Sequence, residues 1–223
     1  MSLPETHPRL SKRPYSQGEL VADGIVHGVA IVAGIIAFPV LLARIVTAGA
    51  ASDAVAVGIY AAGFFLMFGF SCAYNMTPPS PLKWLLRRFD HSAIYVMIAG
   101  TYTALLWRLE DRTWAWGLIA AVWIGALGGS VIKLGWPGRL DRLSIALYLL
   151  LGWAAIVAIG PLVTSLPAAT MILVAIGGLL YSVGIVFYKW ERLKYQNAIW
   201  HGFVAVAAAC HWAGIALVVG PAA

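Results

Sequence analysis

Long apolar runs separated by short polar joints dominate the chain from residue 21 onward. An α-helix needs about 20 apolar residues to cross the hydrocarbon core of a bilayer. The runs lie approximately at residues 21–43, 54–75, 91–108, 114–134, 143–160, 166–188 and 198–219. This pattern predicts an all-α integral membrane protein, with a single seven-transmembrane helix bundle over residues 21–220.

The joint between the fifth and sixth runs is hardly polar. It reads AIGPLVTSLPAAT and contains Gly160, Pro161 and Pro167. Glycine and proline are the strongest local interrupters of regular structure. We therefore expect these three residues to mark the turn between the fifth and sixth helices.

Composition supports membrane insertion. Hydrophobic residues make up 61% of the chain and charged residues 11%, whereas soluble domains average about 45–50% and about 25%. The first 20 residues are polar and lack the apolar core of a secretory signal peptide, so we expect them to form a short cytoplasmic arm. Cys72 and Cys210 both lie in apolar runs and indicate no disulfide framework.

The distribution of basic residues predicts the orientation. With a cytoplasmic N-terminus, only Arg44, Arg108 and Arg112 of the 15 lysines and arginines fall on the outer side. Positive residues concentrate on the cytoplasmic side of membrane proteins, so the C-terminus is expected outside. The net charge of +6 is spread without the dense basic, aromatic-interleaved runs of a nucleic-acid-binding protein. Membrane lipids are the expected partners, and the sequence does not specify an oligomeric state.

Five polar side chains are expected at one membrane depth. Ser71 and Asn75 are one helical turn apart at the cytoplasmic end of the second run, and Asp90 precedes the third. Asn197 and His201 are one turn apart at the start of the seventh. Polar and ionisable residues inside spans are costly and mark functional sites. The topology therefore predicts a polar cluster of three helices at the cytoplasmic side.

The first run adds Glu19, Asp23 and His27, spaced four residues apart on one face near the same side. Two interpretations stay open for them. In the first, Asp23 and His27 line a ligand pocket. In the second, Asp23 is suited to the positive N-terminus of the helix, and His27 is a hydrogen-bonded interior residue. His211 lies ten residues beyond His201, about 15 Å deeper at 1.5 Å per residue, so a separate packing or hydrogen-bonding role is expected.

Several stretches together resemble one protein family. SCAYN, FDHSAIYVMIAGTYT and YQNAIWHGFVAVAAACHW are similar to the three signature regions of bacterial haemolysin III proteins, which belong with the progestin and adipoQ receptor family of seven-helix proteins. ELVADGIVHG and LSIALYLLLGW are similar to that family's first and fifth helices, so the likeness runs from about Glu19 to Trp212. The resemblance implies a bacterial cytoplasmic (inner) membrane protein.

The resemblance also implies a zinc site. The family's pattern has a histidine ligand closing S-x-x-x-H in the second helix, an H-x-x-x-H pair at the start of the seventh, and an aspartate that supports the zinc-bound water. Ser71, Asp90 and His201 match the serine, the aspartate and the second histidine of the pair, but Asn75 and Asn197 occupy the other two histidine positions. An amide oxygen is a poorer zinc donor than imidazole, and a catalytic zinc needs three protein ligands. We therefore expect no metal at full occupancy. If one binds, its ligands are expected to be His201 and Asp90 with Asn75 and Asn197.

Three functions remain open. The first is a metal-depleted protein that binds lipids, or a lipid-like small molecule, and serves membrane homeostasis. The second is a metal-dependent lipid amide hydrolase with an altered site, like the ceramide hydrolysis to which animal relatives of the fold are linked, with Asp90, Ser71 and His201 as catalytic residues. The third is proton or cation transport through Asp23, Asp90 and His201, since intramembrane Asp and His chains mark proton relays.

Overall fold

The computed structural model describes residues 14–136 and 140–219, and every regular element among them is a helix, with no strand. The helices are α1 (Gln17–Thr47), α2 (Ala51–Met76), α3 (Pro81–Leu106), α4 (Arg112–Gly135), α5 (Asp141–Gly152), the 3₁₀ helix η1 (Ala154–Ala158), α6 (Ile159–Ser165), α7 (Ala168–Lys189) and α8 (Gln196–Ala216). The predicted all-α class is confirmed.

Six helical segments of the described chain are long and apolar enough to cross a bilayer: α1, α2, α4, the stretch Asp141–Ser165, α7 and α8. This confirms a multi-pass membrane protein. Helix α3 is as long as α2 but is not among the six. Its first ten residues carry Lys83, Arg87, Arg88 and Asp90, so its hydropathy alone does not identify it as a span.

Helix α1 starts earlier than the apolar run because of a local capping motif. The Ser16 hydroxyl accepts a hydrogen bond from the Glu19 backbone N–H, and the Glu19 carboxylate accepts one from the Ser16 N–H. This reciprocal capping box satisfies two N–H groups that the first helical turn leaves unpaired. Four residues of the expected arm, 17–20, are therefore helical, and residues 1–13 of that arm and residue 220 of the expected domain lie outside the described residues.

The fifth span runs from Asp141 to Ser165 and changes helix type in its middle. The Tyr102 hydroxyl donates to the Gly152 carbonyl and accepts from the Ala155 N–H, with distances of 3.2 Å and 2.7 Å. These bonds satisfy backbone groups at the interruption, as membrane interiors require. The predicted turn at Gly160 and Pro161 is wrong, because both lie in the first turn of α6, where proline is tolerated. The chain turns instead around Pro167, between α6 and α7.

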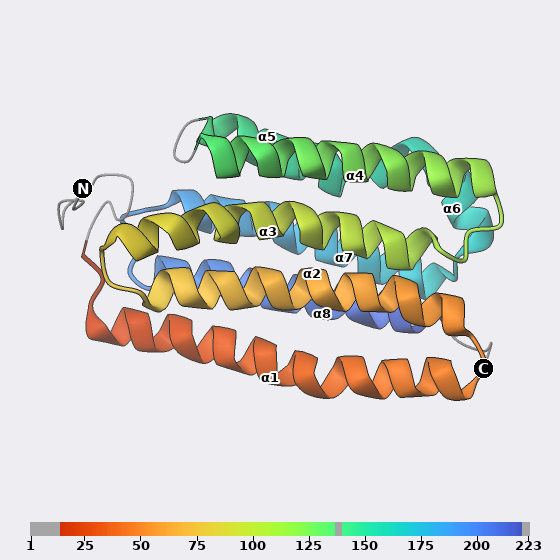
Figure 1. The fold of residues 1–223 in the computed structure, drawn as a ribbon, viewed down its shortest axis with the longest axis horizontal. Helices are drawn as coiled ribbons and strands as arrows, with labels where there is room; N and C mark the ends of the chain where they lie inside the picture. The colour runs from red at the N-terminus through yellow and green to blue at the C-terminus, as the bar shows by residue number, and fades with distance from the viewer. Residues whose placement is uncertain (1–13, 137–139, 220–223) are drawn as a thin grey trace.

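The helices pack as an elongated bundle with α1 at one edge and α4 and α5 at the opposite edge (Figure 1). Helix α1 packs on α2 and α8, α2 on α3, α3 on α4, and α7 on α8. Helices α2 and α3 approach closely, because an added Cβ at Gly63 or Gly100 would stand 3.1 Å from a backbone Cα of the other helix. Small residues commonly permit such close approach in membrane bundles.

Opposite faces of α1 have opposite character. Val21, Ile25, Val29, Val32 and Ile36 are more than half exposed and face outward. A membrane-spanning helix can present such a face to lipid. The other face turns toward α2 and α8, and its buried residues are Glu19, Asp23, His27, Ala30, Gly34, Phe38, Leu41 and Ile45. The polar residues therefore occupy the first three turns of the buried face and apolar residues the rest.

Helices α1 and α8 lie side by side and run in the same direction. At their first turns, the Glu19 carboxylate accepts a hydrogen bond from the Tyr195 N–H at 2.9 Å. At their last turns, Arg44 donates to the carbonyls of Ala216 and Val219. These contacts fix the register of α1 against α8 at both ends, and therefore the heights of the residues between them.

Candidate functional site

A hydrogen-bonded chain of three buried side chains joins α1, α8 and α2. The Nδ1 atom of His201 lies 2.6 Å from Oδ1 of Asp23, and its Nε2 lies 3.2 Å from the Ser71 hydroxyl. Asp23, Ser71 and His201 are 2%, 6% and 7% exposed. Because a carboxylate only accepts hydrogen bonds, the hydrogen between Asp23 and His201 is carried by Nδ1 of His201. The sequence predicts Ser71 and His201 in one cluster, and the structure brings them into contact.

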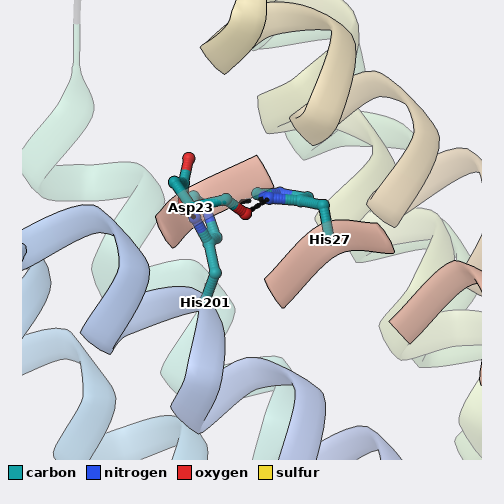
Figure 2. Close-up of side chains that lie close together, drawn as sticks. All are labelled: Asp23, His27 and His201. Atoms are coloured by element: carbon teal, nitrogen blue, oxygen red, sulfur yellow. Dashed lines mark hydrogen bonds and ion pairs between the residues drawn. The ribbon is translucent and has the colours of Figure 1, made fainter. Parts of the chain in front are cut away.

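His27 completes this group from one turn farther along α1. Its ring is fully buried and lies 4.3 Å from the His201 ring, measured between centroids. Its Nδ1 lies 2.9 Å from the backbone carbonyl of Asp23. Its Nε2 and the second carboxylate oxygen of Asp23, Oδ2, are buried and have no hydrogen-bond partner among the described residues. Figure 2 shows the three side chains converging.

Asp23, His27 and His201 each offer a ligand atom within 4.8 Å of the other two. The sequence leaves both a pocket and a structural role open for Asp23 and His27. It places any metal instead between His201, Asp90 and the two asparagines. The metal-capable group in the structure shares only His201 with that expected set, because the buried face of α1 turns Asp23 toward α8.

The two asparagines contact each other at the positions where the resemblance implies zinc ligands. The Asn197 amide donates to Oδ1 of Asn75 at 3.1 Å, and the Asn75 amide donates to the Ser71 carbonyl at 2.9 Å. The Tyr15 hydroxyl donates to the amide oxygen of Asn197 at 3.3 Å. Both amide oxygens therefore already accept hydrogen bonds, and amide oxygen is a weak zinc donor. The zinc ligand set that the resemblance implies does not fit these residues.

Asp90 borders the cluster from α3. Its carboxylate pairs with Nδ1 of the adjacent His91 at 3.0 Å and is hydrogen-bonded to Ser71. Asp90 and His91 are 14% and 13% exposed. All seven predicted site residues therefore gather where α1, α3 and α8 begin and α2 ends, namely Ser71, Asn75, Asp90, Asn197, His201, Asp23 and His27.

An apolar cavity of about 230 Å³ begins next to the polar cluster. Alanines of α1 and α8 line it, among them Ala30, Ala33, Ala205 and Ala208, together with Phe64 and Trp212. Ala30 lies three residues beyond His27, and Ala205 lies four beyond His201. Since α1 and α8 run in parallel, the cavity extends from the polar cluster toward the middle of the bundle.

Comparison with known proteins decides the family. The haemolysin-III related family matches residues 19–212. This chain belongs to that family. It is 38% identical over 186 residues to hemolysin-3 of Bacillus cereus, which covers 83% of this chain and 85% of the relative. It is 39% identical to the hemolysin-3 homolog of Bacillus subtilis, covering 83% of this chain and 87% of the relative.

A more distant relative is the human monocyte to macrophage differentiation factor. It is 29% identical over 164 residues, which is 70% of this chain and 67% of the relative. The match from residue 19 to residue 212 has the bounds that the signature stretches predicted. Membership in the haemolysin-III related family is therefore confirmed.

Three residues beside the site escaped the sequence analysis: Tyr15, His91 and, in its contact with Tyr195, Glu19. The Ser16-x-x-Glu19 spacing indicates a capping box and could have revealed the start of α1 and the position of Glu19. No sequence pattern indicates that the second oxygen of Glu19 bonds to the start of α8. That contact depends on how two helices far apart in the sequence pack.

Proposed function

We propose that this haemolysin-III related protein binds a lipid-like amphiphile, with its polar group at the Asp23–His201–Ser71 chain and its apolar tail in the alanine-lined cavity. The observation that carries this proposal is that the two regions are adjacent along α1 and α8. The cavity begins three and four residues beyond His27 and His201 on the same helices. Ligand sites are mostly apolar, with a few polar groups that set orientation.

The shape of the site supports an amphiphile. The polar end offers both hydrogen-bond donors and acceptors, which suits an amide or hydroxyl head group. The apolar end lies against α1 and α8, and Ala33 and Ala209 of its lining are exposed at the bundle surface. A lipid therefore has a direct route from the bilayer into the cavity. A bound lipid is the basis on which the protein would serve membrane homeostasis.

Filling the cavity tests this proposal. Ala33→Phe places an aromatic ring in the cavity, whereas Val32→Phe places the same ring on the neighbouring outward-facing position of α1, where Val32 is 56% exposed. The measurement is a titration of the purified protein in detergent with a fluorescent N-acyl sphingosine. We expect Ala33→Phe to weaken binding at least tenfold and Val32→Phe to leave it unchanged. Equal binding by both variants contradicts the proposal.

We further propose that α3 is the seventh membrane crossing, with the N-terminus cytoplasmic, the C-terminus outside, and the protein in a bacterial inner membrane. The length of α3 and its packing on both α2 and α4 support this count. The charge distribution supports the orientation, and the Bacillus relatives support a bacterial membrane. Cysteine labelling from each side, at Lys194→Cys and Arg112→Cys, tests it. Labelling of Arg112→Cys from inside contradicts this topology.

Hydrolysis of a bound lipid amide is a second candidate, favoured by the continuous Asp23–His201–Ser71 chain with Asp90 beside it. Hydrolysis adds water across the amide bond and releases a fatty acid and an amine. Asp90 would orient or deprotonate the water, and Ser71 would support it. Fatty acid release from an N-acyl sphingosine that is lost in Asp90→Asn, but kept in the outer-loop variant Asp111→Asn, supports hydrolysis. No release above protein-free detergent removes this candidate.

A further inference from the structure

We propose that Asp23, His27 and His201 together bind one divalent transition-metal ion. Their ligand atoms lie within 4.8 Å of one another, and the three residues are at most 7% exposed. Two of the three belong to α1, to which the resemblance assigns no metal ligand. The inference goes beyond amphiphile binding and does not depend on it.

The hydrogen bonding of His27 is that of a metal ligand. A backbone carbonyl only accepts, so the 2.9 Å contact with the Asp23 carbonyl places the hydrogen of His27 on Nδ1. The Nε2 atom is then a bare lone pair, and it is buried without a partner in the described part of the chain. Metal-binding histidines typically donate their other ring N–H to a carbonyl or a carboxylate. A neutral histidine confined to packing would leave this buried acceptor unsatisfied at a cost of about 1–3 kcal/mol.

Asp23 supplies the negative charge of the site. Its Oδ2 is a second buried atom that has no partner in residues 14–136 or 140–219. Its Oδ1 and the Nδ1 of His201 are 2.6 Å apart and share one hydrogen. A metal ion that binds Nδ1 of His201 takes the place of this hydrogen, and the neutral ring then carries its hydrogen on Nε2, where the Ser71 hydroxyl can accept it.

The donor set selects the class of ion. Two imidazoles and one carboxylate are the protein ligands of many catalytic zinc sites and of non-haem iron(II) sites. Magnesium and calcium prefer sites made of oxygen atoms alone. The set is therefore that of a transition metal such as zinc or iron, with at least one coordination position left for water or for a ligand's polar group.

The same geometry accommodates asparagine at the two positions where the resemblance implies histidine ligands. Asn75 and Asn197 satisfy each other by hydrogen bonding on the α2 side of His201. Asp23 and His27 offer replacement donors on the α1 side of the same histidine. The ligand set thus combines α1 with α8, in place of the α2 and α8 set that the resemblance implies.

Metal content tests the inference directly. The full-length protein, purified in detergent, is equilibrated with micromolar zinc, passed through a desalting column and analysed by mass spectrometry for metal per chain. We expect one zinc, or one iron retained from expression, in the wild type. We expect a loss of at least tenfold in Asp23→Asn and His27→Gln.

Two controls separate this ligand set from its alternatives. His211→Gln makes the same chemical change at another histidine of α8, and the double variant Asn75→Ala, Asn197→Ala removes the amides at the family's ligand positions. Both are expected to keep the wild-type metal content. No metal in the wild type, unchanged metal in His27→Gln, or loss in the asparagine variant each overturns the proposal.

Spectroscopy on the folded protein keeps the inference testable where a variant does not fold. X-ray absorption of the zinc-loaded wild type counts the imidazoles at about 2.0 Å from the metal. Two imidazoles are expected, and one overturns the assignment of His27. In cobalt-loaded His27→Cys we expect a thiolate-to-cobalt charge-transfer band that the wild type lacks, and its absence in the folded variant counts against His27 as a ligand. Ala33→Phe is expected to retain its metal, so failure of amphiphile binding and failure of metal binding give different results.

Discussion

The two histidines of α8 lie in different kinds of surroundings, although only ten residues separate them. His201 contacts side chains of two other helices, Asp23 of α1 and Ser71 of α2. His211 contacts a backbone carbonyl, that of Val174 in α7, at 3.2 Å, and its ring packs where Gly177 has no side chain. Converging ionisable side chains mark a site, whereas a single carbonyl partner in a close-fitting space indicates packing. The separate role predicted for His211 is confirmed.

The largest expected effect comes from removing the partner of His201. Asp23→Ala leaves the buried Nδ1 hydrogen of His201 without its acceptor; an unsatisfied buried donor costs about 1–3 kcal/mol, and the space left by the lost side chain adds to this cost. We expect a lower midpoint of thermal unfolding in detergent. Asp23→Asn is the matched control, because its amide oxygen still accepts from Nδ1 of His201, so its loss should be smaller. An unchanged midpoint in Asp23→Ala would show that this contact does not stabilise the bundle.

An intermediate effect is expected on the His211 side. A Cβ in Gly177→Ala would overlap the His211 ring, and overpacking of a filled interior costs about 1–3 kcal/mol. Gly202→Ala, next to His201, is the control, since nothing lies within 4 Å of its added Cβ. Thermal unfolding should show a clear loss for Gly177→Ala and no loss for Gly202→Ala. Equal midpoints would mean that α7 and α8 pack less closely than described.

The smallest effect is expected from His211 itself. His211→Gln removes the bond to Val174, and a typical intramolecular hydrogen bond contributes about 0.5–1.5 kcal/mol. The variant should unfold slightly earlier than the wild type and bind the fluorescent amphiphile with unchanged affinity. A large loss of amphiphile binding would place His211 in the site and remove the distinction between the two halves of α8.

The sequence predicted which residues gather but not which atoms meet. Ser71, Asn75, Asn197 and His201 follow from helix direction and a four-residue spacing, because both determine height along the bundle. The partner of His201 does not follow from these, since it depends on how α1 is rotated about its axis against α8. Sequence spacing put Asp23 and His27 on one face of α1, and only packing shows that this face contacts His201.

The helices themselves were predictable from the sequence, but an interruption that depends on packing was not. The predicted runs correspond to α1, α2, α3, α4, the Asp141–Ser165 segment, α7 and α8. The change of helix type near Gly152 was not predicted, because it depends on Tyr102 reaching across from α3. The Tyr102 hydroxyl replaces helical hydrogen bonds of the Asp141–Ser165 segment. The hydrophobic pattern of that segment gives no sign of it, because Tyr102 belongs to another helix.

The paired contacts of Glu19 and Arg44 constrain how α1 and α8 can move relative to each other. Glu19 is hydrogen-bonded to the start of α8, and Arg44 is hydrogen-bonded to its end. The alanine-lined cavity lies between these two contacts. Separating the two helices would break both contacts, and sliding one past the other would break at least one. For the lipid proposed above to enter here, it would have to pass between the small side chains of α1 and α8, so the alanine and glycine residues there would limit its size.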